Sequence, residues 1–225
     1  MKKLTTLILI LLILSFGLAG CNQNPRVLKN IFDDKEIHRR YTIEILREFI
    51  GNEYDKSTDL SLILKCKTID LHGIIRTVSF EKAISLNNNN IKKENPDVLP
   101  IFELENTSNV ILTIYGNGYW GRIWAFLLMD LEKLKITNIL IDHMKETGGL
   151  GDDIRFPAFK NQFIGKKIGL SGNNFALHQK GEKIIEGNHS IDGVSGATMT
   201  SIGVIEMLNM ELLKYEEYFR QSLEI

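Results

Sequence analysis

The chain has 225 residues, enough for a single domain with a substantial hydrophobic core. Its formal net charge at pH 7 is -1, so the chain lacks the excess of basic residues that is typical of a nucleic-acid-binding domain. We therefore predict no nucleic-acid partner.

The N-terminal segment 1–20 predicts an export signal. Lys2 and Lys3 precede an apolar run that is shorter than the roughly 20 residues needed to span a bilayer. The run ends in Leu-Ala-Gly directly before Cys21, which resembles a bacterial lipobox, where the cysteine is lipidated and becomes the mature N-terminus. An uncleaved single-span anchor is the alternative. Both interpretations place the following chain on the extracytoplasmic (periplasmic) face of the bacterial cytoplasmic membrane, with residues 21–34 as a polar tether.

The chain has two cysteines, too few for a cysteine-ligated iron–sulfur cluster. If Cys21 carries lipid, Cys66 has no intrachain disulfide partner. We expect Cys66 to be a small buried side chain on a strand. We also predict no metal site.

Residues 35–50 predict a helix with an apolar face, closed by Gly51. Two strand-like runs follow, over residues 60–67 and 73–80. The asparagine-rich stretch 87–96 indicates an exposed loop.

From residue 99 onward the pattern changes to neighbouring strands, without the strand–helix alternation of a parallel sheet. We therefore predict an α+β fold with a mainly antiparallel sheet and flanking helices. A short helix follows around residues 156–164, then a hairpin of 175–179 with 183–185, and an amphipathic helix whose apolar face runs from Val204 to Tyr215. The predicted strands are 99–104, 110–115, 123–129 and 136–143.

Residues 116–121 read GNGYWG, which literally matches the dinucleotide-binding pattern GxGxxG. That fingerprint requires a helix to open at the second glycine. Here an apolar strand follows instead, so we interpret the segment as a glycine-rich turn between two strands.

A second glycine-rich segment, IDHMKETGGLG, covers residues 141–151. Gly148, Gly149 and Gly151 would let the backbone approach a flat ligand closely, and Thr147 offers a hydroxyl group. Without further context the segment is an ordinary turn, and Glu146 is a solvated charge.

The third segment reads DGVSGATMTSIGV over residues 192–204 and leads into the last predicted helix. Unpaired backbone N–H groups at a helix N-terminus favour a phosphate, and Thr198 would lie there. Ser195, Thr198 and Thr200 are candidate caps, and a plain glycine turn with a capping hydroxyl is the alternative. A serine-hydrolase elbow would need a glycine two residues after Ser195, where Ala197 stands, so we reject it as the primary interpretation.

Together these three segments resemble the FMN-binding domain family, which includes the C subunit of the Na+-translocating NADH:quinone reductase (NqrC) and the G subunit of the Rnf complex. The resemblance implies that Thr198 carries FMN through a phosphoester bond. It implies no catalytic side chain. Gly148 stands where the family has proline, which should loosen the unbound loop. The further cofactor-binding residues that the resemblance implies are Asp192, Gly193, Ser195, Gly196, Ala197, Glu146, Thr147, Gly149, Leu150 and Gly151.

The resemblance implies a single extracytoplasmic domain over residues 35–225, with an FMN-binding region at about 99–215. Its implied function is electron transfer within a Na+-translocating NADH:quinone reductase, with no catalysis by the isolated chain. The implied partners are integral-membrane and flavoprotein subunits of that complex, and a flavin transferase during maturation. Three alternatives stay open: a protein like the Rnf G subunit, a free-standing FMN-binding lipoprotein in extracytoplasmic electron transfer, and a non-flavin lipoprotein that binds a ligand or a partner.

Overall fold

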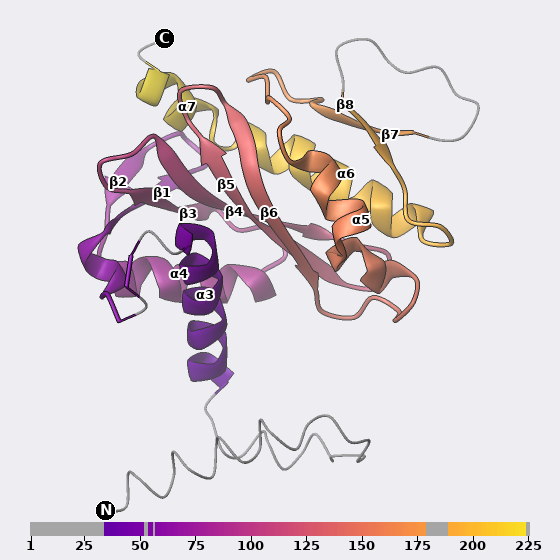
Figure 1. The fold of residues 1–225 in the computed structure, drawn as a ribbon, viewed down its shortest axis with the longest axis horizontal. Coiled ribbons are helices and arrows are strands. Elements are labelled where there is room, and N and C mark those ends of the chain that lie inside the picture. Colours follow the sequence, from indigo (N-terminus) through magenta and orange to yellow (C-terminus); the bar gives the residue numbers. More distant parts are fainter. Residues whose placement is uncertain (1–33, 52–53, 56, 179–188, 224–225) are drawn as a thin grey trace, which may run out of the picture. The chain divides into compact units, whose positions relative to one another are not determined.

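The structure, a computed structural model, describes residues 34–51, 54–55, 57–178 and 189–223 (Figure 1). The predictions for the export signal, Cys21 and nearly all of the tether lie outside these residues. Two compact units divide between Ile37 and His38. Only residues 34–37 of the first unit are described, and the fold below is that of the second unit. No helix in the described ranges is both long and apolar enough to cross a membrane.

A six-stranded, entirely antiparallel sheet forms the centre of the fold, in the order β2-β1-β3-β4-β5-β6. The four strands predicted between residues 99 and 143 are confirmed, each within two residues of the predicted ends. The predicted α+β class is confirmed as well. The strands are β1 Leu64–Asp70, β2 Ile75–Thr77, β3 Val98–Leu104, β4 Asn109–Asn117, β5 Arg122–Asp130 and β6 Lys135–His143.

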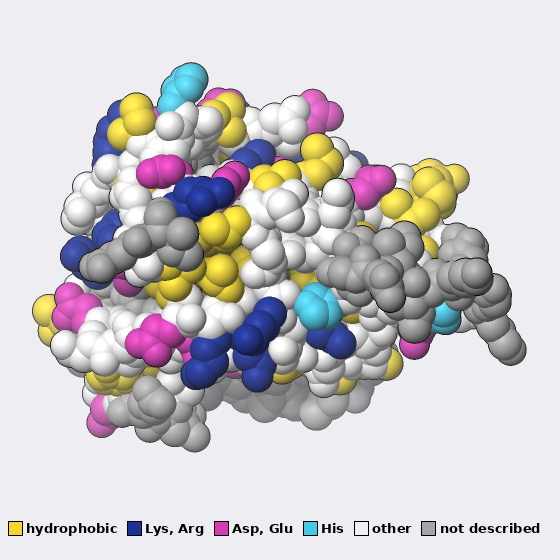
Figure 2. All heavy atoms as spheres, turned by 90° about the horizontal axis from the view of Figure 1, so that it is seen from above, with side chains coloured by type: hydrophobic (Ala, Val, Ile, Leu, Met, Phe, Trp, Pro, Cys, Tyr) yellow, Lys and Arg dark blue, Asp and Glu magenta, His cyan; other side chains and the backbone are white. Residues whose placement is uncertain are grey.

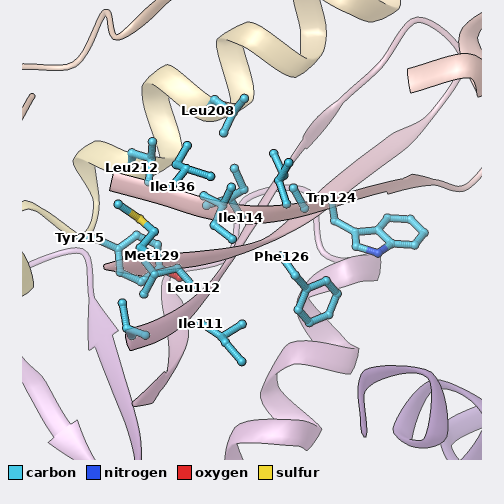
Figure 3. Close-up of a cluster of buried hydrophobic side chains, with 14 of the residues drawn as sticks. Ile111, Leu112, Ile114, Trp124, Phe126, Met129, Ile136, Leu208, Leu212 and Tyr215 are labelled. Atoms are coloured by element: carbon cyan, nitrogen blue, oxygen red, sulfur yellow. The ribbon is translucent and has the colours of Figure 1, made fainter. Parts of the chain in front are cut away.

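Helices cover both faces of this sheet. Strand alternation points Ile114 towards α6 (Thr198–Leu213), where Leu208 packs, and points Phe126 towards α3 (Asp34–Ile50) and α4 (Phe80–Lys92), as Figure 3 shows. The predicted helix 35–50 is confirmed as α3, and Gly51 ends it with φ +72°.

The predicted exposed loop at residues 87–96 is wrong. Most of it belongs to α4, and Asn87 and Asn90 are buried. The Asn87 amide donates to the Thr42 hydroxyl at 2.9 Å, and the Asn90 amide donates to the Val98 carbonyl at 2.8 Å. These tertiary hydrogen bonds compensate the burial of asparagine side chains, which by local propensity favour a turn.

The two strands predicted before α4 are only partly correct. Residues 60–62 form a 3-10 turn, because the Asp59 carboxylate accepts from the Ser61 amide at 3.0 Å, and β1 begins after that turn. The second run contributes only the short strand β2. It ends where Ser79 caps α4 by accepting from the Lys82 amide at 3.3 Å.

Cys66 lies on β1 with 3% of its surface exposed, which confirms its prediction as a buried strand residue. Burial raises the pKa of its thiol to about 12, and the negative charge of the nearby Glu103 carboxylate makes a smaller contribution in the same direction. The thiol therefore stays protonated and unreactive at neutral pH.

The C-terminal third places a two-stranded ribbon beside α6 (Figure 1). The short helix predicted around residues 156–164 is confirmed. The predicted hairpin lies partly outside the described residues, and the observed partner of β7 is β8, in parallel. Val204, Leu208 and Leu212 confirm the apolar face of α6. The elements are η3 Gly151–Arg155, α5 Pro157–Lys160, η4 Asn161–Phe163, β7 Phe175–His178, β8 His189–Asp192, α6 and α7 Glu216–Leu223.

Seen from above, the face formed by the β5–β6 turn and the neighbouring loops carries side chains of both charge signs interspersed with hydrophobic ones (Figure 2). This mixture agrees with the near-zero net charge of the chain.

Candidate functional site

The segment 116–121 contains the predicted turn: Gly116 and Asn117 end β4, residues 118–121 form the turn, and strand β5 rather than a helix follows it. The Gly118 amide donates to the Gly121 carbonyl at 2.7 Å and closes the turn. Tyr119 and Trp120 project from its tip, 58% and 62% exposed, with ring centroids 4.8 Å apart in an edge-on arrangement. The turn therefore displays two aromatic side chains to solvent.

Glu146 joins all three glycine-rich segments. Glu146 is 7% exposed, and its carboxylate accepts from the Trp120 backbone amide at 2.8 Å and from the Thr200 hydroxyl at 2.7 Å. A buried carboxylate requires such donors, and here one donor comes from the β4–β5 turn and the other from α6. The interpretation of Glu146 as a solvated charge is wrong. Its carboxylate instead links the β4–β5 turn to α6, and we call these two hydrogen bonds the Glu146 brace.

The first turn of α6 begins at Thr198 without a side-chain cap. The candidate caps Ser195, Thr198 and Thr200 are therefore wrong for that role. Thr200 faces inward to Glu146, while the Thr198 side chain is exposed at the first helical position. A first turn whose N–H groups receive no side-chain acceptor keeps its partial positive charge directed outward.

Ser201 orders the turn before α6 in place of the predicted caps. Its hydroxyl accepts from the Val194 amide at 2.9 Å and donates to the Ala197 carbonyl at 3.0 Å. The preceding turn is therefore held from inside the protein, and the outer side around Thr198 stays open.

Three glycines permit close approach between these segments. A Cβ atom on Gly203 would lie 2.4 Å from the Asn117 carbonyl oxygen, and one on Gly151 would lie 2.9 Å from the Thr200 hydroxyl oxygen. Gly196 has φ +76°, and a Cβ atom there would lie 2.9 Å from the Leu150 side chain. Leu150 thus covers the turn that precedes Thr198.

The remaining predicted site residues lie around this centre. Thr147 and Gly149 are exposed on the loop, and Gly149 adopts φ +74° with open space around it. Asp192 ends β8 with an exposed side chain, and its backbone exchanges two hydrogen bonds with the Gln162 side-chain amide, at 2.8 and 3.0 Å. Gly193 and Ser195 are exposed before α6, and Ala197 is buried.

Two contributors to the site were not predicted from sequence. Trp120 takes part through its backbone amide, which no side-chain motif reveals. Thr200 takes part through its hydroxyl, and helical periodicity could have indicated this, because Thr200 lies four residues before the buried Val204 and shares its face. Thr198, two residues earlier, falls on a different face.

We expect Glu146→Ala to lower the free energy of unfolding by about 1–3 kcal/mol, because it leaves the Trp120 amide and the Thr200 hydroxyl without their acceptor. Glu146→Gln is the matched control. Its amide oxygen can accept from Trp120 while its nitrogen donates to the Thr200 oxygen, so a smaller loss is expected. Urea unfolding of the three proteins measures both effects. Equal stability of the alanine variant and wild type would contradict the role of Glu146 as a brace.

A family model described as the FMN-binding domain matches residues 118–212, which include all three segments joined by Glu146. The C subunit of Na(+)-translocating NADH-quinone reductase from Haemophilus ducreyi is 35% identical over 102 residues, which are 45% of this chain and 40% of that protein. The same subunit from Yersinia pestis is 38% identical over 106 residues, which are 47% of this chain and 40% of that protein. The chain thus matches about two fifths of the length of these curated relatives.

Solved structures extend the similarity beyond the matched segment. The C subunit of Na(+)-translocating NADH-quinone reductase from Parabacteroides distasonis aligns with a TM-score of 0.64 and 26% identity, over 88% of this chain and 98% of that chain. Shewanella oneidensis NqrC aligns with a TM-score of 0.62 and 19% identity over 85% and 98%, which supports the fold alone. Residues 118–212 therefore match the FMN-binding domain family, and the chain is similar in sequence and fold to the C subunit of the Na+-translocating NADH-quinone reductase.

Proposed function

We propose that this chain is an extracytoplasmic electron-transfer flavoprotein that carries one FMN covalently on Thr198. The observation that carries the proposal is the Glu146 carboxylate, which holds the Trp120 turn and the Thr200 turn of α6 together beside the exposed Thr198. The match of residues 118–212 to the FMN-binding domain family supports the same ligand.

The N-terminus of α6 suits the phosphate of FMN. Thr198 offers the hydroxyl that a phosphoester requires, and the helix begins there without a side-chain cap. The positive end of a helix dipole stabilises an exposed negative charge by ~0.3–1 kcal/mol. The exposed glycines 193 and 196 leave the segment accessible to a flavin transferase.

Exposed apolar side chains on the segments that meet near Thr198 suit the flat isoalloxazine ring. Trp120 is 62% exposed, Leu150 44% and Met199 56%, and they lie on the three segments that Glu146 and Gly196 bring together. Exposed apolar side chains on adjoining segments are typical of a ligand or partner surface. Bound FMN supplies the redox chemistry, and the side chains of this chain position it and exclude water from one side.

By its relatives we further propose that the chain serves in a Na+-translocating NADH:quinone reductase, where it would pass electrons between cofactors of partner subunits. Membrane and flavoprotein subunits of that complex are the proposed partners. Subunits of this type that purify together with the chain would support this assignment. Co-purification with Rnf-type subunits instead, or with no reductase subunits, would favour the corresponding alternative.

The intact mass of the exported protein tests the cofactor. We expect an increase equal to one FMN minus one water when the chain is made in cells that express a flavin transferase, and no increase in cells that lack the transferase. A wild-type protein without that added mass in transferase-containing cells would contradict the proposal and favour the non-flavin lipoprotein.

We also propose that Cys21 is lipidated and anchors the chain to the membrane. Cys21→Ser is expected to abolish incorporation of a labelled fatty acid and to leave an unprocessed or soluble precursor. Cys66→Ser is the matched control, because Cys66 is buried in β1 and inaccessible to the lipidation enzymes. Wild-type protein that stays unlabelled would contradict lipidation and favour the single-span anchor.

A further inference from the structure

Strand β6 lies at an edge of the sheet and presents successive polar side chains to opposite faces. Asp142 lies opposite Trp124 on the face covered by α3, where the Tyr41 hydroxyl donates to its carboxylate at 2.6 Å. His143 lies opposite Ile123 on the face covered by α6. His143 therefore points to the side of the sheet that holds the candidate site.

The hydrogen bonds of His143 define its tautomer. The Glu146 backbone amide donates to Nδ1 at 3.1 Å, which requires that nitrogen to be unprotonated. The ring hydrogen then lies on Nε2 and donates to the Asp152 carboxylate at 2.7 Å. The His143 side chain is 10% exposed and that of Asp152 17%. Both ring nitrogens are thus engaged in a largely buried arrangement.

Asp152 is itself held as a carboxylate. The hydrogen bond from His143 keeps the pKa of Asp152 below its ordinary value. Partial burial acts in the opposite direction, and the nearby Arg155 guanidinium lowers this pKa further. Arg155 pairs with Asp152 and lies 3.7 Å from Asp142. An ionised acceptor favours the Nε2–H tautomer, which leaves Nδ1 as the acceptor for the loop.

The bond to Nδ1 holds the peptide of Glu146, whose carboxylate contacts the other two segments. The loop contains Gly148 and Gly149, which are exposed and add little rigidity of their own. Within the described residues, the loop is tied to the rest of the protein by the His143 bond, by the Met144 amide, which donates to the Arg122 carbonyl at 2.9 Å, and by the Glu146 carboxylate. Without the His143 bond, the Glu146 backbone amide would lose its acceptor, and the backbone beneath the Glu146 side chain would be held less firmly.

We propose that His143, held in its Nε2–H tautomer by Asp152, is a positioning residue that fixes the loop 144–151. Resting on the proposed function, the inference is that His143 thereby sets the midpoint potential of the flavin without touching it. Displacement of the loop would move Leu150 and the Trp120 turn relative to the ring, and the environment of a flavin determines its potential.

Two substitutions separate the two bonds of His143. His143→Asn places an amide oxygen near the position of Nδ1, so it retains an acceptor for the Glu146 amide but does not reach Asp152. His143→Gln places an amide near Nε2, so it retains a donor to Asp152 but leaves the Glu146 amide without its acceptor. His72→Gln, at an exposed turn remote from the loop, is the matched control.

The first measurement is hydrogen exchange of the Glu146 amide in the full chain made without flavin transferase. We expect exchange about 2- to 10-fold faster in His143→Gln, as for the loss of one ordinary hydrogen bond. His143→Asn and His72→Gln are expected to remain close to wild type. Unchanged exchange in a folded His143→Gln protein would overturn the positioning role, and this result does not depend on any flavin.

The second measurement is the midpoint potential of the flavin-loaded full chain. We expect a shift in His143→Gln that is largely absent in His143→Asn, with covalent flavin retained in both. Faster exchange without a shift in potential would overturn the link to the flavin. A wild type that carries no covalent flavin would instead refute the proposed function, and hydrogen exchange would still decide whether His143 positions the loop.

Discussion

Replacing Thr198 with valine is expected to eliminate covalent FMN while the domain stays folded. Valine keeps the branched shape of threonine but removes the oxygen that the phosphoester requires. The Thr198 side chain is exposed and caps nothing, so its loss leaves no buried group unsatisfied. A change in stability within about 0.5 kcal/mol is expected, as for other surface substitutions.

Flavin fluorescence of the denatured protein band, with peptide mass mapping, measures the attachment. Thr198→Ser should retain partial attachment, because it keeps a hydroxyl at that position. Thr200→Val is the comparison variant. It removes a neighbouring hydroxyl and one donor to Glu146 but leaves the Thr198 oxygen, so at least part of the covalent flavin should remain on Thr198. A Thr198→Val band that still fluoresces would place the attachment on another residue.

Gly203→Ala is expected to be strongly destabilising, although alanine is the better helix former by roughly 0.8–1 kcal/mol. The new Cβ would lie 2.4 Å from the Asn117 carbonyl oxygen and 3.2 Å from the Gly118 Cα. Both are backbone atoms and cannot rotate away, so α6 has to move from the β4–β5 turn. We expect the free energy of unfolding to fall by about 1–3 kcal/mol, as for overpacking in a core.

The displacement should also weaken the Glu146 brace, because Thr200 and the Trp120 amide would separate. Gly148→Ala is the matched control. Gly148 has open space around it and no positive φ, so an effect within about 0.5 kcal/mol is expected. Urea unfolding of both variants, analysed with the same dependence of the free energy of unfolding on urea concentration, measures the two changes in stability. A Gly203→Ala protein as stable as the Gly148→Ala protein would contradict the close packing of α6 against the β4–β5 turn.

Local sequence patterns were sufficient for the elements whose burial follows a regular period. The apolar runs between residues 99 and 143 predicted four of the strands, and the three- to four-residue spacing from Val204 to Leu212 predicted α6. The turn at 116–121 was also predictable, because an apolar strand directly follows its glycines. The motif around Thr198 indicated the family for the same reason: its information is contiguous in the chain.

Tertiary structure alone decided which polar side chains are buried. Local pattern predicts Asn87 in a loop, yet it lies inside α4 because Thr42, 45 residues away in sequence, supplies its hydrogen-bond partner. The same kind of pattern predicts a solvated Glu146, yet it is buried because Thr200, 54 residues away, and the Trp120 amide donate to it. A buried polar group is stable only where its partner is present. Such partners lie outside any local pattern, so the brace that assembles the candidate site is visible only in the folded chain.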